Sequence, residues 1–155
     1  MSVTGKIGSA QDEEEIRKLK EVFATGFLKK DAKLRASIWT EDGTVVPPQG
    51  GFFRGRDAME KHFETEAASV TNSSRMNFSN YRFRFITPDA AFVDADITLN
   101  DVLGPDGKVH AVLPVGILFT AVRQAGRWFV QDERAHFKPM TAPASLPDNK
   151  RKEPT

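Results

Sequence analysis

The segment RWFVQDERAHFK, residues 127–138, decides the fold prediction because apolar residues recur two positions apart in it, at Trp128 and Val130 and again at Ala135 and Phe137. A period of two is typical of a β-strand with one face in a protein core. Three earlier stretches share this period and are separated by turn residues, among them Pro88, Gly104 and Gly126. We therefore predict four strands joined by tight turns, at residues 76–86, 91–102, 109–123 and 127–138.

The residues before this strand region have helical spacing instead. Ile16, Leu19, Phe23 and Phe27 recur at steps of three and four, which places them on one face of a helix that starts at a capping pair, Ser9 with Asp12. Two further helices are predicted, the second capped by Asp31 with Leu34 and Ile38 inward, and the third capped by Asp57 with Glu60. Helices first and antiparallel strands last predict an α+β fold, with three helices on the concave face of a curved, mainly antiparallel sheet.

Composition narrows the class of protein. The chain has 155 residues, 39% hydrophobic and 28% charged, which fits one domain; we place it at residues 10–138, between flexible ends at 1–9 and 139–155. A net charge of +1 argues against a nucleic-acid partner, and no apolar run reaches the length of a membrane span. The absence of cysteine excludes thiolate chemistry and fits the cytoplasm.

Four short segments resemble the nuclear transport factor 2-like superfamily: WTEDG at 39–43, FRGRD at 53–57, PDAA at 88–91 and RQAGRW at 123–128. Within it the sequence is most similar to SnoaL-like proteins of the SgcJ/EcaC branch. Residues 90–100 and 126–128 also resemble the association domain of calmodulin-dependent kinase II. The resemblance implies a cone-shaped fold with a pocket between the sheet and the first and third helices. It specifies fold rather than function, since relatives include isomerases, cyclases, dehydratases, hydrolases and non-catalytic assemblies.

Strand alternation then predicts which polar side chains line that pocket. In relatives the tryptophan equivalent to Trp128 points inward, and a two-residue loop at 125–126 places Asp132, Arg134 and His136 on the same face. Asp132 could abstract a proton next to a carbonyl group, and Arg134 could bind the resulting enolate oxygen. Alternatively, the two form an ion pair at the open end of the cone, and His136 is a rim or packing residue. The residues expected to contact a ligand are Trp39, Met59, Phe63, Tyr81, Phe119 and His136.

The hairpin around Pro88 leaves two alternatives open. A three-residue loop at 88–90 turns Asp94 and Asp96 to the convex face, opposite Arg84 and Arg82. A two-residue loop places Asp96 beside Tyr81 on the aromatic face, an arrangement that resembles the oxyanion hole of ketosteroid isomerase. We favour the external ion pairs, because they leave no buried charge without a partner.

Two functions are compatible with these features. The first is a SnoaL-like isomerase, cyclase or dehydratase acting on a small apolar carbonyl compound by acid–base catalysis without a cofactor. The second is a non-catalytic ligand-binding or oligomerisation module. We expect no metal, because the three histidines, at 62, 110 and 136, are far apart in the sequence, and no cofactor, because no dinucleotide fingerprint is present. A homodimer is expected through an apolar stripe on the convex face, Leu118, Val122 and Phe129.

Overall fold

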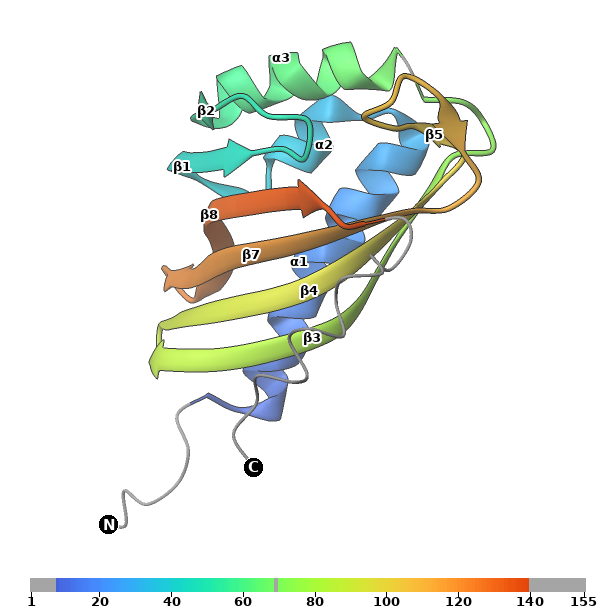
Figure 1. Cartoon of the computed structure of the whole chain (residues 1–155). Coiled ribbons are helices and arrows are strands. Elements are labelled where there is room, and N and C mark those ends of the chain that lie inside the picture. The colour runs from blue at the N-terminus through green and yellow to red at the C-terminus, as the bar shows by residue number, and fades with distance from the viewer. Residues whose placement is uncertain (1–7, 69, 140–155) are drawn as a thin grey trace, which may run out of the picture.

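The computed structural model describes residues 8–68 and 70–139, so most of both predicted flexible ends lies outside the described residues. Three helices precede or interrupt the first strands: α1 (Ala10–Lys29), α2 (Ala32–Ala36) and α3 (Arg56–Ala67). A six-stranded sheet has the order β2-β1-β8-β7-β4-β3. Its members are β1 (Trp39–Val46), β2 (Phe53–Arg54), β3 (Arg75–Thr87), β4 (Ala90–Asn100), β7 (Leu113–Gln124) and β8 (Arg127–Phe137). The sheet curves around the helices (Figure 1), which confirms the predicted α+β fold.

A separate two-stranded sheet lies between β4 and β7 in the chain. It pairs β5 (Val102–Leu103) with β6 (Val109–His110) around the turn at Gly104 and Gly107. The hairpin stands at the end of the sheet where α3 ends (Figure 1). The chain therefore leaves the main sheet after β4 and re-enters it at β7.

Helix α1 begins as the sequence predicts. The Ser9 hydroxyl accepts a hydrogen bond from the Asp12 backbone N–H, and the Asp12 carboxylate accepts one from the Ser9 N–H, which completes a capping box. The helix ends at Lys29, and the left-handed backbone of Lys30 (φ 56°) turns the chain so that the Asp31 N–H reaches the Gly26 carbonyl at 2.8 Å. Its buried face contains Ile16, Phe23 and Phe27, as predicted, but also Lys20.

The two shorter helices differ from prediction in their details. Asp31 caps α2 by accepting from the Leu34 N–H, but Leu34 itself is only half-buried and the inward side chain is Arg35. Helix α3 begins at Gly55 without a side-chain cap, so the predicted role of Asp57 as a cap is wrong. Glycine fits this position because its backbone takes a φ of 86°, which strains residues with a Cβ.

The last hairpin has the predicted turn but not the predicted register beyond it. Ala125 and Gly126 both have positive φ, as a two-residue hairpin loop requires, and Ala121 lies opposite Val130. The next pair is Thr120 with Asp132, so Gln131 is an extra residue on β8. From this bulge onward every β8 side chain points to the face opposite to the one expected.

Strand β1 explains where the bulge lies. It runs parallel to β8, with Trp39 beside Val130 and Thr44 beside Asp132, so residues 40–43 bow out over Gln131. A Cβ on Gly43 would lie 2.6 Å from the Gln131 carbonyl oxygen, which only glycine avoids. The WTEDG segment is thus the part of β1 that packs against the bulge.

The β3–β4 hairpin turns its aspartates outward. Its loop has two residues, because Thr87 pairs with Ala90, but a bulge before Thr87 restores the parity expected from a three-residue loop. Arg82 lies opposite Asp94, not Asp96, and Asp96 instead accepts hydrogen bonds from Lys138 and Asn80. The favoured external placement is confirmed, although the partners differ.

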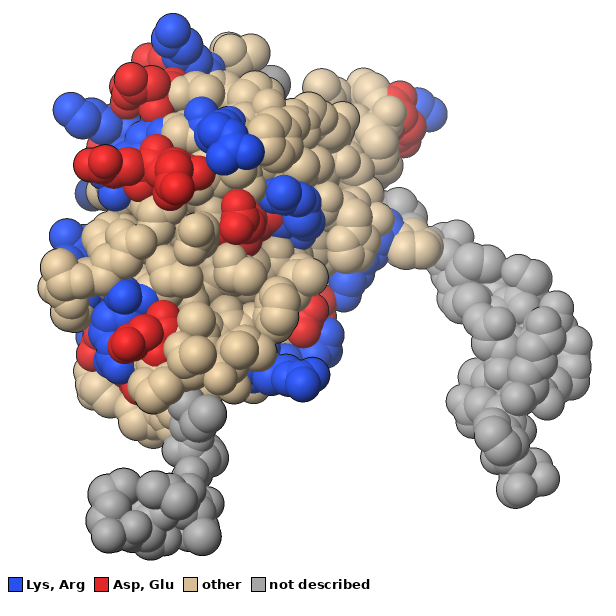
Figure 2. All heavy atoms as spheres, turned by 90° about the vertical axis from the view of Figure 1, so that its left-hand side faces the viewer, with Lys and Arg blue, Asp and Glu red and all other residues tan. Residues whose placement is uncertain are grey.

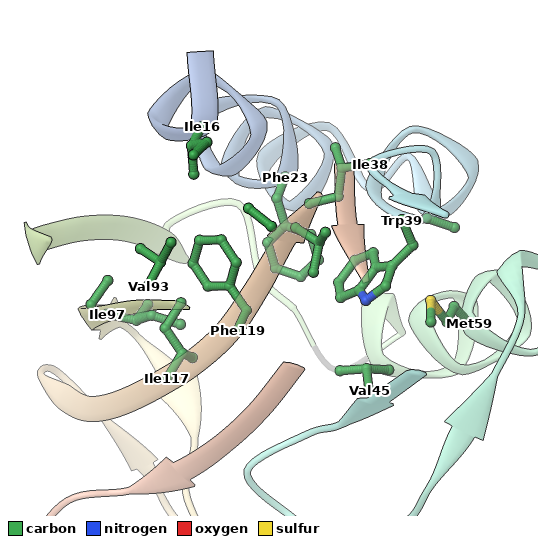
Figure 3. Close-up of a cluster of buried hydrophobic side chains, with 14 of the residues drawn as sticks. Ile16, Phe23, Ile38, Trp39, Val45, Met59, Val93, Ile97, Ile117 and Phe119 are labelled. Atoms are coloured by element: carbon green, nitrogen blue, oxygen red, sulfur yellow. The ribbon is translucent and has the colours of Figure 1, made fainter. Parts of the chain in front are cut away.

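The core fills the space between α1 and the concave face of the sheet. Ile16 and Phe23 of α1 meet Val93, Ile117 and Phe119 of the sheet (Figure 3). Trp39 packs with an edge-to-face contact on Phe23, at a ring-centroid distance of 5.7 Å. This packing closes the centre of the cone and leaves a cavity at one end of it.

Candidate functional site

The cavity lies at the end of the cone where α3, the β5–β6 hairpin and the end of β8 meet. Its volume is about 330 Å³, within the range of small-molecule sites. Most of the wall is apolar, and four of the aromatic side chains on it are Phe23, Phe27, Phe63 and Phe137. Ionisable side chains are few among the described lining residues: Arg35, His62, Glu66 and Glu133.

Glu133 is the inward-facing carboxylate of β8. The bulge at Gln131 sets it on the concave face, between Val45 of β1 and Phe119 of β7, and only 4% of its surface is exposed. Its carboxylate accepts a hydrogen bond from the Lys20 ammonium group of α1. A carboxylate in apolar surroundings therefore has an opposite charge behind it and the cavity in front of it.

Lys20 is fully buried in an aromatic environment. Its ammonium nitrogen lies 4.6 Å from the centroid of the nearest ring, and four rings surround it: Phe119, Phe23, Trp39 and Phe78. Burial lowers the pKa of Lys20, while the charge of Glu133 opposes that shift. Replacing a buried ion pair by apolar residues often does not reduce stability. The contribution of this pair to stability therefore does not explain its presence in the core.

A second ion pair lies in the cavity wall. Arg35 Nη1 donates to Glu66 Oε1 at 2.8 Å, and the guanidinium group lies over the rings of Phe63 and Phe23, at 4.2 and 4.4 Å. The pKa of Glu66 is about 2, because hydrogen bonding to His62 and the charge of Arg35 outweigh burial, which acts in the opposite direction. Arg35 thus holds Glu66 as a carboxylate.

His62 completes this group from one turn earlier on α3. Its Nε2 lies 3.6 Å from Glu66 Oε2, and its ring stacks on Phe53 with centroids 4.3 Å apart. The imidazole is thereby fixed at the cavity wall beside a carboxylate, the arrangement in which histidine exchanges protons with a bound molecule. Acid–base groups therefore reach the cavity wall from both α3 and β8.

The three polar residues predicted for the pocket lie on the outer face instead. Asp132 accepts a 2.5 Å hydrogen bond from the Thr44 hydroxyl, which in turn accepts one from Arg134 Nη1 at 3.0 Å. His136 lies over Gly116, also on this face. Their expected inward orientation is wrong because the bulge at Gln131 changes the parity of β8 after Val130. Asp132 and Arg134 are linked through Thr44 and do not form the direct ion pair that was the alternative.

The aromatic and apolar residues predicted as ligand contacts lie partly at the cavity and partly in the core. Phe63 lines the cavity, whereas Trp39, Met59 and Phe119 are fully or almost fully buried in the core beside it. Tyr81 belongs to a stacked series with Phe83 and Phe85 on β3, which Arg17 of α1 covers, and burial raises the pKa of its hydroxyl. The structure thus brings one of these residues to the cavity.

The sequence contained a signal for some of the residues that were missed. Lys20 lies four residues after Ile16 and three before Phe23, so it shares their apolar helix face. His62 and Glu66 have the i,i+4 spacing of a helical pair. For Glu133 the signal was a change of parity, because the apolar positions shift from Trp128 and Val130 to Ala135 and Phe137, which puts Glu133 on the same face as the second pair.

The surface and the ionisable groups give two further observations. On the face shown in Figure 2, acidic and basic side chains lie next to each other rather than in areas of one sign. Within residues 8–68 and 70–139, no helix is long and apolar enough to cross a membrane, and no three acidic, histidine or cysteine side chains are grouped as a metal site would need.

A curved sheet that wraps helices around an end cavity is the nuclear transport factor 2-like, or cystatin-like, fold. The family model described as a SnoaL-like domain matches residues 8–134, and the chain belongs to that family. Its assignment to the SgcJ/EcaC branch stays a prediction. No curated protein matches the sequence.

Solved structures share the fold at low sequence identity. An uncharacterised protein with a cystatin-like fold from Caulobacter vibrioides has a TM-score of 0.76 and 18% identity, covering 91% of this chain and 99% of that chain. A candidate scytalone dehydratase from Novosphingobium aromaticivorans has a TM-score of 0.70 and 15% identity, covering 83% and 85%. A candidate calcium/calmodulin-dependent protein kinase II association domain from Xanthomonas campestris has a TM-score of 0.67 and 16% identity, covering 91% and 99%. At these identities the likeness establishes the fold alone.

Proposed function

We propose that this SnoaL-like protein binds a small, largely apolar carbonyl compound in the end cavity and moves a proton on it, as a cofactor-free isomerase, cyclase or dehydratase. The observation that carries the proposal is the Glu133 carboxylate, which lies in the apolar cavity wall with Lys20 behind it. A charge in such surroundings is costly, and groups of this kind concentrate at functional sites.

Glu133 is the proposed general base. It takes a proton from the carbon next to the ligand carbonyl; the C–H electron pair forms the new C=C bond, and the π pair of the C=O bond moves onto the oxygen. Once Glu133 has taken the proton, its negative charge has moved to the enolate, which the positive charges of Lys20 and Arg35 then stabilise in its place. The protonated Glu133 then gives the proton to another carbon of the conjugated enolate as the C=O bond re-forms, which completes an isomerisation.

His62 is the proposed second proton donor or acceptor. Its position at the cavity wall, with Glu66 beside Nε2, suits protonation of a departing hydroxyl group in a dehydration. Two acid–base positions in one cavity are what an isomerase or a dehydratase needs. The relative described as a candidate scytalone dehydratase is consistent with such chemistry, although it shares only the fold.

The alternative is a binding or assembly module without chemistry, in line with the relative described as an association domain. An open cavity with acid–base groups favours catalysis, whereas a module that only assembles has no need of a buried carboxylate facing an open cavity. A cone filled by touching side chains would have favoured assembly.

Deuterium exchange tests the proposal. The protein is incubated in D2O with a panel of neutral ketones, such as 2-acetylnaphthalene, 1-indanone and cyclohexanone, and exchange next to the carbonyl is followed by NMR. We expect the protein to accelerate exchange for at least one ketone, and Glu133→Gln to reduce the rate by about a hundredfold or more.

Asp132→Asn is the matched variant for this test. It removes the neighbouring carboxylate, which lies on the outer face, and we expect exchange to continue. Loss of exchange in Asp132→Asn, with retention in Glu133→Gln, would assign the base to Asp132 and overturn the proposal. No acceleration by the unaltered protein for any ketone would favour the non-catalytic module.

A further inference from the structure

The charges around the cavity are already matched within the protein. Glu133 is paired with Lys20, and Glu66 is paired with Arg35. The two anions and two cations sum to zero. A ligand that enters this end of the cone therefore meets an apolar wall in which the charges of these four side chains cancel.

The geometry of Arg35 makes it a poor receptor for an anion. One of its terminal nitrogens is engaged by Glu66, and the guanidinium faces the rings of Phe23 and Phe63 at 4.4 and 4.2 Å. A ligand carboxylate would have to displace Glu66 or remain without a partner in apolar surroundings. Both alternatives cost free energy, because an unpaired charge loses its hydration there.

One donor of the same side chain remains unsatisfied. Arg35 Nε is buried and has no hydrogen-bond acceptor, and it is the only such side-chain atom among the described residues. Buried polar groups are nearly always hydrogen-bonded, so an orphan next to a cavity calls for an acceptor. A carbonyl or hydroxyl oxygen provides one without adding charge.

From these contacts we infer that the ligand is electrically neutral and carries an acceptor oxygen on an apolar, ring-sized body. The inference rests on the proposed function, because it assumes that the cavity is the ligand site. It adds that the wall disfavours ionic ligands, because Glu66 already pairs with Arg35 and Lys20 already pairs with Glu133.

Three molecules of nearly equal shape test this inference. 2-Acetylnaphthalene is neutral, 2-naphthoate is an anion and 2-naphthamidinium is a cation. In each, the carbon attached to the naphthalene ring carries two further heavy atoms, so the three differ mainly in charge. Their affinities are measured by calorimetry and by quenching of tryptophan fluorescence at pH 8, where histidine is largely neutral. We expect the ketone to bind at least about tenfold more tightly than either ion.

Glu66→Gln removes the negative charge of this side chain and keeps its shape. It leaves the cation of Arg35 without its carboxylate, so we expect the affinity for 2-naphthoate to rise about tenfold while that for the ketone changes less than about twofold. Glu64→Gln removes the same charge from an exposed position on α3, outside the cavity, and is expected to change neither affinity.

The outcomes separate two claims, that the ligand is neutral and that the cavity is its binding site. Equal or tighter binding of either ion by the unaltered protein, or an unchanged 2-naphthoate affinity in Glu66→Gln, would overturn neutrality while leaving the cavity as the ligand site. If none of the three binds at millimolar concentration, the cavity is not the site, and the proposed function fails together with the inference.

Discussion

Lys20 and Glu133 are separated by 113 positions in the sequence, yet they form a hydrogen-bonded ion pair with both side chains buried. One comes from the middle of the first helix and the other from the last strand. The pair therefore links the two ends of the domain through its core, and its carboxylate faces the cavity.

The first prediction concerns the stability of this pair. Lys20→Met leaves Glu133 as a buried charge without its cation, and we expect the free energy of unfolding to fall by about 3–5 kcal/mol. The double variant Lys20→Met with Glu133→Met removes both charges, and we expect most of the loss to be recovered. Urea unfolding followed by circular dichroism measures both. A double variant as unstable as the single one would show that the cost is packing rather than charge.

The second prediction is a pH dependence centred on Glu66. Its folded pKa of about 2 lies below the ordinary value of 4.5, so it stabilises the fold fully above that value. This contribution is lost as the pH falls from about 4.5 toward 2. We expect unfolding in urea at pH 6 and pH 3 to show a smaller loss of stability for Glu66→Gln than for the unaltered protein. Glu64→Gln should behave like the unaltered protein; equal pH slopes in all three would contradict the prediction.

The third prediction concerns the start of α1. Asp12 Oδ1 accepts from Arg123 Nη1 at 2.9 Å and from Trp128 Nε1 at 3.3 Å, in addition to its role in the capping box. Asp12→Ala removes all of these, and we expect a loss of about 1–2 kcal/mol in the free energy of unfolding. Glu21→Ala, at an exposed position on the same helix, serves as the control. Equal small losses in both variants would mean that this junction contributes nothing specific.

The fourth prediction concerns self-association, which we propose occurs through the convex face of the sheet. Phe92 of β4 and Leu118 of β7 are 43% and 41% exposed there, on neighbouring strands. Val122 and Phe129, expected in the same stripe, are half-buried and paired across β7 and β8. Analytical ultracentrifugation at micromolar concentration should give a dimer, and Leu118→Glu should give a monomer. A monomeric mass for the unaltered protein would refute the proposal.

Much of the fold followed from local patterns. The capping box at Ser9 and Asp12, the cap at Asp31 and the hairpin turn at Ala125 each depend on neighbouring residues only, and each is present as expected. The side chains that line the cavity were predicted less well. A parity count along β8 places Asp132 inward, and one extra residue at Gln131 reverses that result.

The sequence by itself determined the order of elements, the start of α1 and the turn at residues 125–126, since helix spacing, caps and turn residues act over a few positions. Only the tertiary structure decided that Glu133 rather than Asp132 reaches the cavity, that Lys20 pairs with it and that Arg35 is buried. It also decided the outward placement of Asp94 and Asp96, because that placement depends on a bulge before Thr87. The bulge forms where β1 packs alongside β8, with Gly43 against the Gln131 carbonyl. The sequence carries only a faint trace of this contact, because the apolar positions of β8 change from even (Trp128, Val130) to odd (Ala135, Phe137) across the bulge.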